Sequence, residues 1–270
     1  SVAGDKLAIF NFTFDWHLPY LFWSGLIGGT FLSCASHGTD QLIVQRLLAA
    51  RNMRESQKAI IASGVIVFFQ FALFLLAGVV LFGFYWHHPP AKPFLRPDLV
   101  FPSYVVNYLP TGLAGLVVAA ILAAAMANLS AAFNSLASSS VVDFYKPFFQ
   151  PHADEKHYLR VSRVVTLAWG GVLIFIALLA QNVHKSVLEL ALTIASVPYG
   201  CMLGIFLLGV LTRRVNGTAA ALGAVGGLGV ILGFMGLTQV AWTWYVAIGT
   251  SATFVIGLAS SLVVRSQEVP

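Results

Sequence analysis

The chain has 270 residues, of which 58% are hydrophobic and only 9% are charged, and its formal net charge is +5. A soluble domain is about 25% charged, so this composition excludes an ordinary soluble protein, which would lack the polar side chains to cover its surface. The basic residues occur in short segments between apolar runs and not in one stripe, which argues against a nucleic-acid partner. The expected surroundings are therefore a lipid bilayer.

Seven segments are long and apolar enough to cross a bilayer, which takes about 20 residues each. The sequence therefore predicts an all-α polytopic membrane helix bundle, with residues 1–270 as a single transmembrane domain. The segment 87–110 is rich in proline and is predicted to be an extended outer loop. In chain order, the predicted spans are residues 19–36, 60–86, 112–136, 161–181, 187–211, 217–237 and 242–264.

The basic residues are distributed unevenly between the two sides that these spans define. Eleven of the 15 fall on one side, and the positive-inside rule places that side in the cytoplasm. We expect a multi-pass protein of the plasma membrane, with its N-terminus outside and its C-terminus in the cytoplasm. The eleven are Arg46, Arg51, Arg54, Lys58, Lys146, Lys156, Arg160, Arg163, Arg213, Arg214 and Arg265, and the other four are Lys6, Lys92, Arg96 and Lys185.

The first span contains an unusual cluster of glycines, Gly25, Gly28 and Gly29. Such a cluster is typical of close packing against a neighbouring helix. It is also typical of a discontinuous helix whose unwound backbone lines a binding site near the middle of the membrane. We predict a break near Gly28–Gly29, with the free backbone groups lining a cavity because they cannot face lipid unpaired.

The third span changes from ordinary apolar helix to a run of alanine, serine and asparagine. Ala124, Ala127 and Asn128 share one helix face, and Ser130 and Asn134 lie on a second polar stripe at a spacing of four. Two interpretations stay open: a small-residue packing face held by interhelical hydrogen bonds, or one wall of a cation pathway.

The sequence contains no pattern typical of an enzyme. It has no HExxH, GxSxG, Walker or CxxC motif, and no lysine lies in the middle of a span where it could hold retinal. We therefore expect neither an enzyme nor a bound organic cofactor.

Two motifs identify a family resemblance, with a weaker third. They read GTDQLIVQRLLAARNMRESQKA at 38–59, AAAMANLSAAFNSLASSSVVDFYKP at 123–147 and FLLGVLTRRVNGTAA at 206–220. In these motifs and their spacing the chain resembles the sodium:solute symporter family, which implies a LeuT-type fold of two inverted five-helix repeats. The resemblance implies that residues 18–211 form the second repeat and residues 217–264 two peripheral helices. The first repeat would be absent, so we expect a C-terminal fragment, in keeping with the missing initiator methionine.

The resemblance also implies a sodium site on the third span. The carbonyl position of the family corresponds to Ala124, and its two hydroxyl positions correspond to Ala127 and Asn128, neither of which bears a hydroxyl. Sodium is a hard cation that prefers oxygen ligands, as calcium and magnesium do. The amide oxygen of Asn128 can serve, Ala127 cannot through its side chain, and Ser130 offers a further oxygen on the neighbouring face.

The solute positions of the family's sugar-transporting branch correspond to smaller residues in this chain. Ser33 and Ser36 stand in the first span, Val67 replaces a lysine and Thr193 replaces a glutamine. The resemblance thus implies a solute smaller or less hydroxylated than a hexose, such as a monocarboxylate, an amino acid or a vitamin.

Together these residues imply a secondary active transporter that couples sodium entry to the uptake of a small organic solute by alternating access. Its partners would be the solute, the sodium ion as coupling ion, the lipid bilayer and the missing N-terminal repeat. The alternative is a sodium-independent or sensory membrane protein that kept the fold and lost coupling, as the absent hydroxyl pair would allow. Sodium dependence of uptake discriminates between the two.

Overall fold

The computed structural model describes residues 10–90, 92–180, 186–212 and 215–263, and every regular element in these ranges is a helix. The chain divides into two compact units, the first with residues 1–74 and 187–270 and the second with residues 75–186. The long helix α4 (Met53–His87) contributes to both. Five of the basic residues used to predict orientation lie outside the described residues, namely Lys6, Lys185, Arg213, Arg214 and Arg265.

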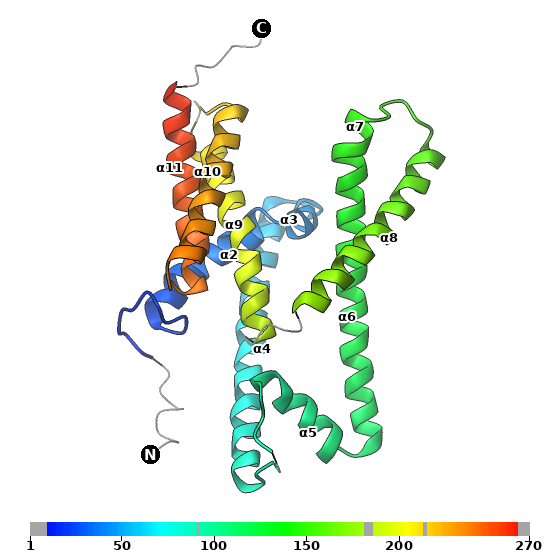
Figure 1. Ribbon diagram of the computed structural model, residues 1–270, viewed down its shortest axis with the longest axis vertical. Helices are drawn as coiled ribbons and strands as arrows, with labels where there is room; N and C mark the ends of the chain where they lie inside the picture. Colours follow the sequence, from blue (N-terminus) through cyan, green and yellow to red (C-terminus); the bar gives the residue numbers. More distant parts are fainter. Residues whose placement is uncertain (1–9, 91, 181–185, 213–214, 264–270) are drawn as a thin grey trace. The chain divides into compact units, whose positions relative to one another are not determined.

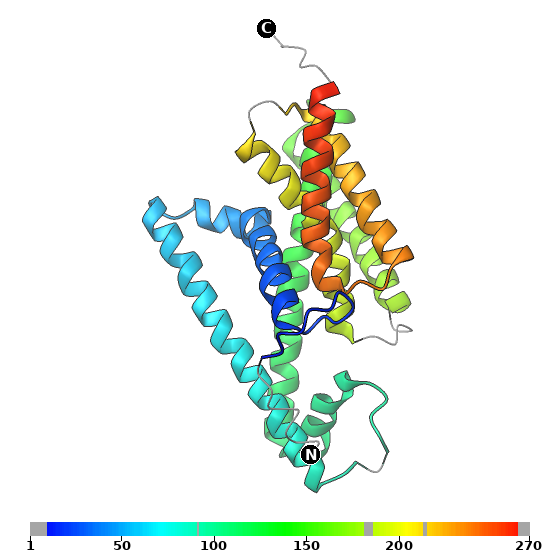
Figure 2. The same cartoon turned by 90° about the vertical axis from the view of Figure 1, so that its left-hand side faces the viewer.

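The first unit is built on three long helices, α9 (Val187–Leu211), α10 (Gly217–Leu237) and α11 (Tyr245–Val263). They lie side by side in both ribbon views (Figures 1 and 2), and their buried residues Cys201, Ile231 and Tyr245 form one apolar cluster. Helix α10 begins where the side chain of Asn216 accepts a hydrogen bond from the N–H of Ala219 at 2.8 Å, which caps the helix. The unit also contains η1 (Ser24–Gly28), α2 (Gly29–Gly38), α3 (Gln41–Leu48) and η4 (Trp242–Trp244).

Small residues allow α11 to approach α9 and α10 closely. A Cβ atom at Gly204 of α9 would lie 2.5 Å from the Cβ of Thr253, and one at Gly223 of α10 would lie 2.7 Å from the carbonyl oxygen of Thr253. Both distances are shorter than real contacts, so these positions accept only glycine without a shift of the helices. Between helices in lipid, where apolar burial gains little, such close van der Waals packing supplies much of the attraction.

The helix that was predicted to break at Gly28–Gly29 is continuous. The π-helical turn η1 runs directly into α2, and both glycines keep right-handed helical angles (φ −62°, ψ −41° and φ −62°, ψ −39°). The N–H of Gly29 donates to the carbonyl oxygens of Gly25 and Leu26. The prediction of a break is therefore wrong, because a π turn keeps the backbone groups paired within the helix.

Gly28 serves close packing instead. A Cβ at this position would overlap the carbonyl oxygen of Thr243 in η4 and lie 2.9 Å from its carbonyl carbon, whereas a Cβ at Gly29 meets nothing within 4 Å. Helix α2 then packs on α9 and α11 through the buried residues Ala35, Leu203 and Val246.

Hydrogen bonds and a ring contact join the segment that precedes η1 to the connection between α10 and α11. The N–H of Ala241 donates to the carbonyl oxygen of Trp16 at 2.8 Å, and the rings of Trp16 and Trp244 lie 4.5 Å apart between their centroids. Nδ1 of His17 lies 3.0 Å from the carbonyl oxygen of Gln239. These contacts hold the start of the first helix against the start of α11 (dark blue and orange in Figure 2).

The second unit contains the end of α4, one short helix and two long helices. Helix α6 (Thr111–Ser139) continues through the π-helical segment η3 (Ser140–Tyr145) into α7 (Lys146–Phe148), and α8 (Glu155–Ala180) packs against α6 (Figure 1). The indole N–H of Trp169 on α8 donates to the hydroxyl of Ser140 at 3.0 Å, and the hydroxyl of Tyr145 lies 2.9 Å from Nε2 of His157. These bonds join the two helices where α6 becomes η3.

The loop predicted to be extended at 87–110 is partly helical. It contains η2 (Pro97–Leu99) and α5 (Val100–Tyr108), so that part of the prediction is wrong. The prolines allow this because they lie before α5 or in its first turn, where a missing N–H costs no helical hydrogen bond, or after its end, as Pro110 does. Aromatic contacts then hold α5 to the end of α4, with the ring of Phe84 5.0 Å from that of Tyr104 and 4.8 Å from that of Tyr108.

Six helices in the described residues are long and apolar enough to cross a membrane, against about seven predicted. The difference is the first span, where η1 and α2 together are shorter than the others. The ends of α9 and α10 coincide with the predicted spans 187–211 and 217–237. The six are Met53–His87, Thr111–Phe148, Glu155–Ala180, Val187–Leu211, Gly217–Leu237 and Trp242–Val263.

Candidate functional site

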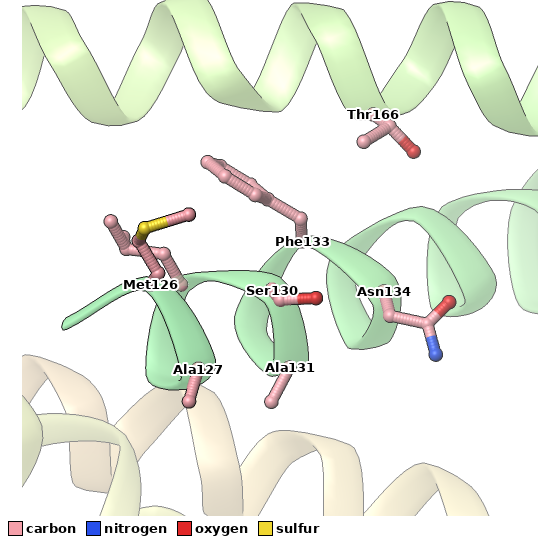
Figure 3. A pocket seen from close by; sticks show the side chains of 8 residues that line it. Met126, Ala127, Ser130, Ala131, Phe133, Asn134 and Thr166 are labelled. Carbon is pink, nitrogen blue, oxygen red and sulfur yellow. The ribbon is translucent and has the colours of Figure 1, made fainter. Parts of the chain in front are cut away.

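The second unit carries an open groove of about 710 Å³ between α6 and α8. Figure 3 shows Phe133 projecting from α6 toward α8, and Thr166 pointing back from α8. Two of the predicted sodium ligands, Ala127 and Ser130, line this groove. Its lining residues are Met126, Ala127, Leu129, Ser130, Ala131, Phe133, Asn134 and Thr166.

The polar groups of the groove are neutral oxygen and amide groups. Ser130 and Asn134 are the stripe that the spacing of four predicted, and both are exposed. Neither side chain makes a hydrogen bond to another described residue, whereas the hydroxyl of Thr166 donates to the carbonyl oxygen of Ser162 at 2.8 Å. Among the residues that the structure describes, none that lines the groove is charged. Such a surface offers oxygen ligands to a cation without a carboxylate.

The other two predicted sodium ligands, Ala124 and Asn128, lie on α6 but do not line the groove. They contact each other, because the side-chain amide of Asn128 donates to the carbonyl oxygen of Ala124 at 3.0 Å. All four predicted residues are exposed on the surface of α6. The described residues contain no cluster of three His, Cys, Asp or Glu side chains that could hold a metal ion.

The predicted solute residues lie in the first unit, on two helices that pack together. Ser33 is exposed and Ser36 half-buried on α2, and the hydroxyl of Ser36 lies 2.9 Å from Nδ1 of His37. Thr193 is half-buried on α9, where its hydroxyl donates to the carbonyl oxygen of Glu189 at 2.6 Å. These residues therefore lie on two helices that pack together, and no hydrogen bond between described residues joins Thr193 to either serine.

Two tyrosine–carboxylate hydrogen bonds that the sequence did not predict join the first helix to α9. The hydroxyl of Tyr20 donates to Oε1 of Glu189 at 2.7 Å near the beginning of both helices. The hydroxyl of Tyr199 donates to Oδ2 of Asp40, which follows the end of α2, at 2.9 Å. The partners are 169 and 159 residues apart. No sequence pattern predicts either pairing, because the position of Tyr20 is equally typical of an interfacial aromatic residue.

Comparison with known proteins decides the family. The sequence profile of the sodium:solute symporter family matches residues 12–227, which is most of the chain. The chain belongs to the sodium:solute symporter family. Membership confirms the resemblance drawn from the motifs at 38–59 and 123–147, and it confirms that the chain is not an enzyme.

Relatives of this family member include a sialic acid transporter and a monocarboxylate transporter. The chain is 30% identical over 236 residues to the sodium/sialic acid symporter NanT of Aliivibrio fischeri, covering 86% of this chain and 46% of NanT. It is 28% identical over 256 residues to the human sodium-coupled monocarboxylate transporter 2, covering 92% of this chain and 39% of that protein. The chain therefore spans less than half the length of these relatives.

A solved structure of a Na⁺-coupled sialic acid symporter in a substrate-bound outward-open state has the same fold. The TM-score is 0.77 at 23% sequence identity, and the match covers 94% of this chain and 52% of that chain. The fold class is thus confirmed as an all-α, LeuT-type helix bundle. With its apolar spans, this symporter-family chain is a multi-pass membrane protein.

Proposed function

We propose that this chain forms part of a secondary active transporter that couples sodium entry to the uptake of a small organic solute by alternating access. Membership of the sodium:solute symporter family over residues 12–227 is the observation that carries the proposal. The sodium gradient would supply the free energy, so the function requires sodium as coupling ion and no organic cofactor.

We propose that this chain contributes its sodium ligands from α6. The amide nitrogen of Asn128 lies 3.0 Å from the carbonyl oxygen of Ala124. A half-turn of the amide, whose last torsion is broad and roughly two-fold, would put its oxygen beside that carbonyl at about the same distance. Two oxygens about 3 Å apart suit a cation whose oxygen ligands stand at about 2.3–2.6 Å. Ala127 lies on the same helix face as these two oxygens. Ser130 lines the groove instead, and we propose it as a further oxygen on the neighbouring face.

Two or three ligands on one helix do not complete the shell of a hard cation, which takes six or more oxygens in the case of calcium. We propose that a first repeat, outside these 270 residues, supplies the rest from the opposite side of the site. It would also cover the exposed surface of α6. In this scheme residues 18–211 form the second repeat and residues 217–264 the two peripheral helices.

The solute would contact Ser33 and Ser36 of α2 and Thr193 of α9. These hydroxyls are small, and the hydrogen bonds of Tyr20 and Tyr199 join α9 to the two ends of the first helix. Short hydroxyl side chains favour a solute smaller or less hydroxylated than a hexose. Monocarboxylates, amino acids and vitamins are the proposed classes, and the names of the relatives include a monocarboxylate transporter and a multivitamin transporter.

We further propose that the transporter resides in the plasma membrane. The start of this chain would lie outside the cell and its end in the cytoplasm. The support is the uneven distribution of basic residues, which in membrane proteins collect in cytoplasmic loops.

The direct test is solute uptake by the full-length protein reconstituted in proteoliposomes. Labelled lactate, alanine and biotin represent the three proposed classes, and each is offered with an inward sodium gradient or with potassium in its place. We expect one class to accumulate only under the sodium gradient. Equal uptake in sodium and potassium would support the uncoupled alternative. A second arm contains only these 270 residues, and sodium-driven uptake by that arm would contradict the half-site arrangement.

A further inference from the structure

The first unit contains a second cavity, distinct from the groove on α6. Its volume is about 210 Å³, and it lies between η1, the beginning of α2, α9 and η4. Gly25 and Gly29 line it from the first helix, Ser196 from α9, and Trp242 and Thr243 from η4. The solute residues Ser33, Ser36 and Thr193 do not line it, so it is separate from the proposed transport site.

One hydroxyl group in the cavity lining has no hydrogen-bond partner among the described residues. Thr243 is only 9% exposed, and its Oγ1 has no hydrogen-bond partner among the described residues. The indole N–H of Trp242 is likewise buried without a partner there. By contrast, Ser24 donates to the carbonyl oxygen of Pro19 at 2.7 Å, and Ser196 donates to that of Leu192 at 2.6 Å. Buried polar groups are nearly always paired, so the two unused groups on η4 indicate a polar atom that comes from outside the chain.

The rest of the lining defines the size and charge of what fits. No charged side chain among the described residues lines the cavity, and apart from Tyr20 its other surfaces are glycine backbone and apolar side chains such as Leu21, Leu32 and Val246. A dry cavity of about 150 Å³ is large enough to bind benzene. A cavity of 210 Å³ therefore accommodates a ring with one small polar substituent, and its lining disfavours an ion.

We propose that this cavity is a binding site for a small neutral alcohol of about the size of phenol. The ring or alkyl part lies against the glycines of η1 and α2, where the absence of side chains makes the room. The hydroxyl of the ligand pairs with Oγ1 of Thr243 and can accept from the indole N–H of Trp242. The π-helical turn at Ser24–Gly28 forms one wall, and π turns frequently occur at functional sites.

The test uses the purified chain in lipid nanodiscs and two ¹⁹F NMR probes, 4-fluorophenol and the apolar analogue 4-fluorotoluene. Empty nanodiscs give the partitioning background. We expect saturable binding of 4-fluorophenol above this background. Thr243→Val keeps the shape of the side chain and removes its hydroxyl. In this variant the affinity for 4-fluorophenol should fall about three- to tenfold, the effect of losing one neutral hydrogen bond. The affinity for 4-fluorotoluene should not change.

A second, independent test introduces larger side chains at glycines that line the cavity. Gly29→Leu and Gly25→Leu place a side chain at such positions, and the added Cβ atoms meet nothing within 4 Å. Gly64→Leu on α4 is the matched control, since its Cβ also meets nothing and it lies away from the cavity. Loss of binding in both cavity variants but not in the control supports the site. Absence of saturable binding by the wild-type chain, or full binding by the cavity variants, overturns it.

Discussion

The packing of Gly28 against Thr243 gives a sharp prediction about the first helix. A methyl group added by Gly28→Ala would overlap the carbonyl oxygen of Thr243 and stand 2.9 Å from its carbonyl carbon, well inside van der Waals contact. The blocking atoms belong to the backbone of η4, which cannot swing aside as a side chain would. The neighbouring substitution Gly29→Ala meets nothing within 4 Å and serves as the matched control.

Both substitutions replace a helical glycine by alanine. Only Gly28→Ala adds a methyl group that overlaps the backbone of Thr243. Alanine gains about 0.5–1 kcal/mol of helix stability over glycine at either position. Overpacking costs about 1–3 kcal/mol and applies only at Gly28. The difference between the two variants therefore isolates the steric cost, and it corresponds to about 2–12 °C in Tm. Gly29→Ala should unfold above the wild-type chain, and Gly28→Ala should unfold well below Gly29→Ala.

Thermal unfolding of the purified chain in detergent micelles measures this difference. Cys201 is buried in the cluster of α9, α10 and α11, whereas Cys34 is exposed on α2. In a Cys34→Ala background, a maleimide dye therefore reports unfolding through Cys201 alone. Equal Tm values for Gly28→Ala and Gly29→Ala would refute the close approach of η1 to η4.

Two further predictions concern the same unit and use the same assay. Tyr199→Phe should lower the free energy of unfolding by about 1.5–3 kcal/mol, because the hydroxyl donates to the carboxylate of Asp40 at 2.9 Å; strict additivity with Asp40→Asn in a double-mutant cycle would show that the pair does not interact. Gly227→Ala should be less stable than Gly229→Ala by about 1–3 kcal/mol, because a Cβ at Gly227 would lie 3.0 Å from that of Thr253 while one at Gly229 meets nothing. Equal stabilities of these two variants would contradict the packing of α10 on α11.

The sequence predicted helices correctly where local sequence signals mark their ends. The predicted ends of α9 and α10 were correct because apolar runs stop there at polar or turn-forming residues, such as Asn216 before α10. The polar stripe of Ser130 and Asn134 also followed from helical spacing alone, and both residues line the groove between α6 and α8. A local sequence pattern is enough to predict a feature that depends on a single helix.

The sequence failed where one pattern allows two tertiary outcomes. Clustered glycines fit an unwound helix and a close helix crossing equally well, and only the position of η4 shows that Gly28 serves the crossing. The pairing of Tyr20 with Glu189 depends on how α9 lies against the first helix. The sodium and solute residues came from family resemblance, and their roles stay predictions.

The sodium dependence of uptake by Asn128 variants of the full-length transporter tests the central claim most directly. If Asn128 is a ligand, Asn128→Ala should raise the sodium concentration for half-maximal uptake about tenfold, equivalent to about 1.4 kcal/mol, and Asn128→Ser should retain much of the wild-type affinity. Asn107→Ala on α5 is the matched control, because Asn107 is an exposed residue whose amide also donates to the carbonyl oxygen four residues earlier. An unchanged sodium dependence in Asn128→Ala at normal expression would remove this residue from the site and favour an uncoupled protein.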